Sequence, residues 1–130
     1  MSNNLVVINR VYNEVASKIT PTYLNTPPII NTSVLPYATL IVDDDGQNPG
    51  WADHWAVADF RVVVTGDFNL GTAPIMSKLQ EIYDHLHTMN LSITGYRGMI
   101  QMLQGPRIYP NTSNLLTRGY IMGRTTGNFR

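Results

Sequence analysis

The sequence predicts an α+β fold, in which an antiparallel sheet of about four strands carries two helices packed on one face. Two segments repeat apolar residues at the three- and four-residue spacing of an amphipathic helix. Other segments show the β-branched runs or two-residue alternation of strands, in the order helix, strand, strand, helix, strand, strand. The length of 130 residues, 43% of them hydrophobic, suits one domain with a single core.

The first helix is predicted over residues 4–19, with Asn3 or Asn4 as its cap. Its apolar positions, spaced for one helix face, are Val7, Ile8, Val11, Val15 and Ile19. Pro21 lies just beyond its predicted end. The residue before a proline disfavours helical backbone angles, so the helix is expected to end before Pro21. The prolines and polar residues of segment 20–34 then predict an extended loop.

Two strands are predicted next. Residues 37–42 form an apolar, β-branched run that ends in the turn-forming sequence Asp43-Asp44-Asp45-Gly46. Along residues 55–65, apolar side chains alternate with polar ones, and Asp59 and Arg61 fall on the polar side. This alternation is typical of an antiparallel strand with one buried face.

The clearest helix is predicted over residues 73–89, where apolar residues follow one another at intervals of four, three and four. Thr72 is its predicted cap. Two more strands are predicted over 96–103 and 115–126, and the glycine and proline residues between them predict a loop at 104–114.

The chain carries few charges, and they are unevenly distributed. Charged residues make up 14% of the chain and the net charge is zero, which disfavours a free-standing basic nucleic-acid-binding domain. Residues 1–70 hold seven acids and three bases, whereas residues 71–130 hold two acids and six bases. Regions of opposite sign suit head-to-tail contact between identical subunits, an arrangement that closes into rings. We expect no disulfide, signal peptide or membrane helix, since cysteine and long apolar segments are absent from the sequence.

Motifs for catalysis or metal binding are weak. The run Asp43–Asp45 lacks the alternating ligands and following glutamate of a calcium loop. His85 and His87 would point to different sides of a helix, and His54 has no recognisable nucleophile as a partner. The turn 66–71 lacks the Lys-Ser/Thr pair of a phosphate-binding loop. We therefore expect a protein that is not an enzyme and that holds no cofactor or metal.

Strand arginines are the remaining candidates for a functional surface. They are Arg97, Arg107, Arg118 and Arg124, and Tyr96, Tyr109 and Tyr120 lie near them in the sequence. Such a surface could follow a nucleic-acid backbone. Ordinary outward-facing strand residues or salt bridges between subunits are favoured instead, because the sequence shows no signature of a known nucleic-acid-binding module.

Several segments together resemble a known protein family. They are Leu35-Pro36-Tyr37-Ala38-Thr39-Leu40, Asp59-Phe60-Arg61-Val62-Val63-Val64, the helix with Ile75, Leu79, Ile82, Tyr83 and Leu86, Leu91-Ser92-Ile93-Thr94-Gly95-Tyr96, Met102-Leu103-Gln104-Gly105-Pro106-Arg107, and Thr117-Arg118-Gly119-Tyr120. This arrangement resembles the tail terminator, or tail completion, proteins of long-tailed bacteriophages, in which a Leu-x-Leu-x-Gly segment follows the long helix. The resemblance covers about residues 5–125. The acidic segment 43–54, with Trp51 and His54, departs from the commoner members.

The resemblance implies an α+β subunit that forms a homohexameric ring on the head-proximal end of the tail tube. Such a ring is assembled in the cytoplasm of the host bacterium, stops tube growth, joins tail to head and remains in the virion. Its implied partners are the tail tube protein, a neck or head-completion protein and, where the tail contracts, the tail sheath. DNA passes through the ring lumen without sequence-specific binding, and no membrane partner or catalytic residue is implied.

The candidate contact residues for subunits or partners combine the acidic segment, one turn and the basic strands. They are Asp43, Asp44, Asp45, Trp51, Asp67, Arg107, Arg118 and Arg124. Two alternatives stay open at this point: another neck or tail-tube component, and a small module that binds nucleic acid or a ligand.

Overall fold

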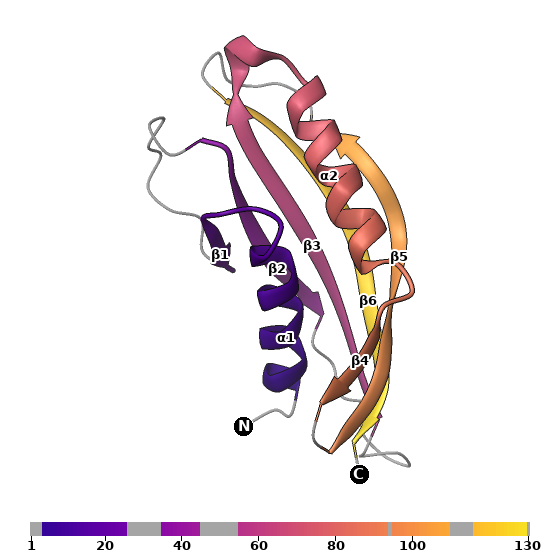
Figure 1. Cartoon of the computed structure of the whole chain (residues 1–130). Helices are drawn as coiled ribbons and strands as arrows, with labels where there is room; N and C mark the ends of the chain where they lie inside the picture. The colour runs from indigo at the N-terminus through magenta and orange to yellow at the C-terminus, as the bar shows by residue number, and fades with distance from the viewer. Residues whose placement is uncertain (1–3, 26–34, 45–54, 94, 110–115, 130) are drawn as a thin grey trace.

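The computed structural model describes residues 4–25, 35–44, 55–93, 95–109 and 116–129 (Figure 1). One sheet of six strands forms the body of the molecule, and both helices pack on the same face of it. In chain order the elements are α1 (Asn4–Ala16), β1 (Thr22–Leu24), β2 (Tyr37–Asp44), β3 (Trp55–Asp67), the 3₁₀ turn η2 (Phe68–Leu70), α2 (Ala73–Leu86), β4 (Asn90–Ile93), β5 (Tyr96–Ile108) and β6 (Leu116–Phe129).

The α+β class and the two helices on one face are confirmed, but the predicted sheet was wrong in two respects. The strand order is β1-β2-β3-β6-β5-β4, so the sheet has six strands rather than about four. It is also mixed, because β1 runs parallel to β2 while the other neighbouring pairs are antiparallel. The two strands that the sequence did not predict are β1 and β4, at the edges of the sheet. Each is too short for apolar alternation to be recognised in the sequence.

Strand β1 forms inside the segment predicted to be a loop because tertiary contacts hold it. The Tyr12 hydroxyl, on α1, donates a hydrogen bond of 2.7 Å to the Thr22 carbonyl oxygen. The Asn25 amide donates to the Leu40 carbonyl oxygen at 2.7 Å, and the Asn25 side-chain oxygen accepts from the Val42 amide at 2.9 Å. The two Asn25 bonds use the edge of β2, where unpaired backbone groups would otherwise be left.

Strand β5 corrects the prediction of a loop after residue 103, since it continues to Ile108 beside β6. Two irregularities make this possible. The register steps from Met102 to Gln104 and again from Gln104 to Arg107, each time with one extra residue on β5. Gly105 and Pro106 fall within the second irregularity, where a bulge tolerates residues that disfavour a regular ladder.

The core lies between the sheet and the helices, as the apolar periodicity predicts. Its helical members are Val7, Ile8, Val11 and Val15 from α1 and Ile75, Leu79, Ile82 and Leu86 from α2. Its central strand, β3, contributes Ala58, Phe60, Val62 and Val64. Within the described ranges, no helix has both the length and the apolar character that crossing a bilayer requires.

Strand β6 meets this core with glycine at every fourth position, and these glycines make room for large neighbours. A Cβ on Gly119 would lie 2.8 Å from Leu79 Cδ1, and one on Gly127 would collide with the hydroxyl end of Tyr96. Tyr96 is therefore a core residue that lies against the β6 backbone, and its burial raises the pKa of its phenol to about 12.

Candidate interaction surface

Strand alternation places a group of arginines on the sheet face opposite the helices, which we name the basic face. In β3, Phe60 and Val62 are core residues, so Arg61 between them points the other way. In β6, Ile121 is in the core, so the residues one or three positions away from it along the strand lie on the opposite face. The arginines of the basic face are Arg61, Arg97, Arg107, Arg118 and Arg124, and Asp59 is the acid among its described side chains.

The bulges in β5 determine the position of Arg107. The register pairs Arg107 with Tyr120, which lies on the basic face, and pairs Ile108 with Gly119 on the helix side. Each extra residue by itself would reverse the alternation along β5, and the two together restore it, so Arg107 stays on the same face as Arg97. The bulges shift Arg107 along β6, where it lies opposite Tyr120, whereas a regular ladder would place it opposite Arg118.

Two of these arginines are held by neighbours on the face itself. Arg124 Nε lies 2.6 Å from Asp59 Oδ1 and Arg124 Nη2 lies 3.1 Å from Asp59 Oδ2, an ion pair with two hydrogen bonds. Arg61 Nη1 donates to the Tyr109 hydroxyl at 2.8 Å. The Tyr109 ring in turn packs on Tyr120, with ring centroids 4.6 Å apart. The centre of the basic face is thus a fixed polar network.

The other three arginines, Arg97, Arg107 and Arg118, are exposed. Apolar side chains lie beside them on the outward side of β5, where Met99 is 41% exposed and Leu103 is 46% exposed. The surface is therefore mixed, with cationic and apolar groups on the same strand. The predicted partnership with tyrosines is partly wrong: Tyr109 and Tyr120 are on the face, whereas Tyr96 points into the core.

The acidic candidates are placed less closely together. Asp43 and Asp44 form the end of β2, and the Asp44 backbone is in register with Asp59. Asp45 and Trp51 lie outside the described residues, as does His54. The structure thus brings Arg107, Arg118 and Arg124 onto one face, with the end of β2 beside Asp59 at one end of the sheet.

Asp67 has a local structural role. It caps η2, where its carboxylate accepts a hydrogen bond of 2.9 Å from the Asn69 amide. This cap positions two exposed apolar residues at the tip of the molecule, Phe68 at 36% and Leu70 at 68% exposure. Asp67 lies at the same end of the sheet as Arg118. The register pairs Asp67 with Leu116, and Leu116 is two residues before Arg118 on β6.

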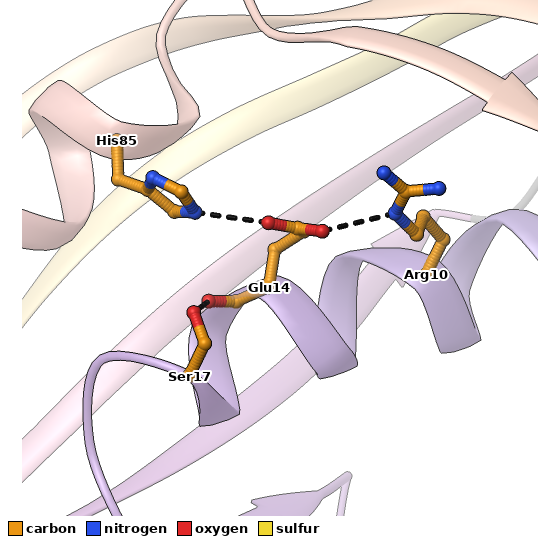
Figure 2. A network of polar contacts seen from close by, with 4 residues as sticks. All are labelled: Arg10, Glu14, Ser17 and His85. Carbon is orange, nitrogen blue, oxygen red and sulfur yellow. Dashed lines mark hydrogen bonds and ion pairs between the residues drawn. The ribbon is translucent and has the colours of Figure 1, made fainter.

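A second polar cluster, which the sequence analysis missed, joins the two helices (Figure 2). Glu14 of α1 lies between Arg10, with Nε at 3.0 Å, and His85 of α2, with Nε2 at 2.9 Å. Burial alone would raise the pKa of Glu14, but the hydrogen bonds and charges of His85 and Arg10 outweigh it and the pKa is lowered. The spacing of Arg10 and Glu14 is visible in the sequence, whereas the approach of His85 is a tertiary contact.

Neither cluster has the geometry of a metal centre. Among the residues that the structure describes, no group of three or more histidine and acidic side chains could hold a metal ion. His85 is engaged with Glu14, and the nearby His87 ring stacks on Tyr83 with centroids 5.3 Å apart. The arrangement on the basic face offers charge, hydrogen bonds and apolar contact, which are the means of binding a macromolecule.

Comparison with known proteins identifies the fold. No protein-family model and no curated protein matches the sequence. Among solved structures, a chain of the "Virion of native gene transfer agent (GTA) particle" is similar, with 20% sequence identity, a TM-score of 0.64 and 91% of each chain covered. The overall fold of this chain is therefore also found in a protein chain of that virion particle.

Proposed function

We propose that this chain is a non-enzymatic structural protein of a phage-like virion. The observation that carries the proposal is the structural likeness to a chain of the gene transfer agent particle, which covers 91% of both chains. A likeness over nearly the whole of both chains favours a shared type of role more than a likeness confined to one motif does. The mixed basic and apolar face supports the same proposal, because a protein that assembles with others needs such a contact surface.

Within that class, we propose the role of tail terminator. The resemblance of the strand and helix segments to tail terminator proteins supports this choice. In this role, copies of the chain form a ring, with six subunits in the proposal, on the head-proximal end of the tail tube. The tube protein would bind one side of the ring, and a neck or head-completion protein would bind the other.

The proposed mechanism is capping. One side of the ring matches the growing end of the tube, while the other side lacks the surface that would recruit another tube subunit. Addition of a terminator ring is then favourable once and cannot be repeated. DNA would cross the ring without sequence-specific binding, and the sheath would meet the ring where the tail contracts.

Electron microscopy of lysates tests this proposal. Deleting the gene from the phage that encodes it should give overlong tails beside DNA-filled, unjoined heads, and restoring the gene in trans should return normal virions. Normal, infectious virions from the deletion would contradict the proposal. Tails of normal length that fail to join heads would indicate a neck component instead.

Negative-stain images of the purified protein distinguish a tail terminator from the remaining alternative, a subunit of the tail tube. A tube subunit polymerises into long hollow tubes, whereas a terminator stops at one ring. Long tubes formed by the chain alone would therefore assign it to the tail tube. Short rings that bind to one end of preformed tubes and stop their growth would support the terminator.

A further inference from the structure

Cations are concentrated at one end of the basic face. Arg107 of β5 lies opposite Tyr120 of β6 in the register, and Arg118 is two residues from Tyr120 on the same strand. Arg107 and Arg118 are thus diagonal neighbours on adjacent strands, a separation of ~7–8 Å. Both side chains are exposed, and neither makes a hydrogen bond or an ion pair with the described part of the chain.

A third arginine, Arg61 of β3, reaches the same place. Its Nη1 donates to the Tyr109 hydroxyl at 2.8 Å, and the Tyr109 ring packs on Tyr120 with centroids 4.6 Å apart. Because the hydroxyl is neutral, this bond orients the guanidinium without cancelling its charge. We name Arg61, Arg107, Arg118, Tyr109 and Tyr120 the arginine–tyrosine cluster. Arg61 was not among the candidates from the sequence, so this grouping is visible only in the structure.

The described acids near the cluster are engaged elsewhere. Asp59 is bonded to Arg124, which lies six residues along β6 from Arg118, a distance of ~20 Å at ~3.3 Å per residue. Asp67 is nearer, but its carboxylate accepts the Asn69 amide and makes no ion pair with a described residue. Among the described side chains, the cluster is therefore a local excess of positive charge in a chain of zero net charge.

The three arginines follow one another in a row along β6. Arg107 is in register with Tyr120 and Arg61 with Met122, so the cations stand at the levels of positions 118, 120 and 122 of this strand. Successive levels are ~7 Å apart at ~3.3 Å per residue. A nucleic-acid backbone presents its negative charges in a regular row as well. The spacing of the cluster therefore suits a polyanion better than a single anionic group.

The chemistry of the cluster also suits phosphate groups. Guanidinium groups bind phosphate oxygens through paired hydrogen bonds, and tyrosine hydroxyls donate to phosphates too. The exposed apolar residues of β5, Met99 and Leu103, precede the cluster on that strand, and Met99 is in register with Thr126, eight residues along β6 from Arg118. This end of the face is thus polar and cationic, as protein–DNA interfaces are in comparison with protein–protein interfaces.

We propose that the arginine–tyrosine cluster binds the phosphate backbone of duplex DNA directly and without sequence preference. The inference goes beyond the proposed function, in which DNA only crosses the ring and no residue binds it. The contact is weak, because about three phosphates are neutralised and a chain of zero net charge adds no general attraction. We expect a Kd of ~10⁻⁵ M at low ionic strength. Such contacts allow DNA to slide, which is compatible with its passage.

Fluorescence anisotropy of a labelled ~30-base-pair duplex, titrated with the purified full chain, tests the inference. With ~3 phosphate contacts, raising the salt concentration from ~0.05 M to ~0.2 M should weaken binding ~40-fold, because each contact releases counterions. Arg118→Gln removes one cation, so it should weaken binding at ~0.05 M salt ~10-fold and reduce the slope of log Kd against log salt by ~1. Arg107→Gln should have the same effect.

Lys18→Gln is the matched control, because it removes the same charge from the helix side. The bond between Lys18 and Lys78 uses the Lys18 carbonyl oxygen, so this variant keeps it. Affinity and salt dependence should both be unchanged in the control, and circular dichroism of each variant checks that the fold is retained. A duplex of different base composition should bind equally well, since phosphates carry no sequence information.

Several results would overturn the inference. They are a flat titration up to ~10⁻⁴ M protein at ~0.05 M salt, binding that does not change with salt, and equal losses in Arg118→Gln and Lys18→Gln. Poly-glutamate that displaces the duplex at a lower concentration of charge would assign the cluster to an acidic protein instead. Each of these results leaves the tail terminator role intact, because the gene deletion tests that role separately. Cluster-dependent DNA binding with normal virions in the deletion would contradict only the proposed function.

Discussion

The contact between β6 and α2 gives a prediction whose magnitude follows from the structure. Gly119 faces α2, and a Cβ at this position would lie 2.8 Å from Leu79 Cδ1 and 2.9 Å from the Arg107 carbonyl oxygen. The second neighbour is backbone, so rotation of one side chain cannot relieve both contacts. Overpacking of this kind costs ~1–3 kcal/mol, and replacing glycine by alanine returns ~0.4–1 kcal/mol of chain entropy. The expected net loss for Gly119→Ala is ~1–2 kcal/mol.

Urea unfolding followed by circular dichroism measures this loss, and thermal unfolding should show a fall in Tm of ~4–8 °C. Gly105→Ala is the matched control, because a Cβ there meets nothing within 4 Å. It should leave the unfolding free energy unchanged or raise it by up to ~1 kcal/mol. Equal stabilities for the two variants would refute the reasoning.

Shortening the side chain that a Cβ on residue 119 would meet provides a second check on the same contact. Leu79 is fully buried, so Leu79→Ala alone should cost ~2–5 kcal/mol. In the double variant, Gly119→Ala fills part of the space that Leu79 leaves. The cost of the double variant should therefore fall short of the sum of the single costs by ~1 kcal/mol. Strict additivity would show that Gly119 and Leu79 are not in contact.

Three further predictions concern charged groups. Because the pKa of Glu14 is lowered in the folded chain, the unfolded chain binds its proton more readily. The contribution of Glu14 to the unfolding free energy is therefore complete above about pH 4.5 and is lost as the pH falls further. Glu14→Gln should reduce the dependence of the unfolding free energy on pH in this acidic range, measured by urea unfolding at a series of pH values. Asp59→Asn removes a partly buried ion pair to Arg124 and should cost ~1 kcal/mol, less at high salt, and a salt-independent loss would contradict it. Asp67→Ala removes the cap of η2 and should cost ~0.5–1 kcal/mol while speeding hydrogen exchange at the Asn69 amide, and unchanged exchange there would contradict the assigned role.

The candidate surface could be predicted from the sequence only in part. Alternation in β3 correctly placed Asp59 and Arg61 on the side away from the core, because a period of two is a property of the strand alone. The pairing of Asp59 with Arg124 joins residues 65 positions apart, and no local pattern indicates it. The same holds for the hydrogen bond from Arg61 to Tyr109, which depends on the register of three strands.

By itself, the sequence determined the fold class, both helices and the four long strands. Apolar periodicity acts over a few residues, so it identifies each element before that element has found its neighbours. Only the tertiary structure decided the edge strands β1 and β4, the bulged continuation of β5, and the collection of five arginines on one face. Those features arise because backbone groups at a sheet edge and side chains on adjacent strands are satisfied by residues distant in the chain, which local sequence does not specify.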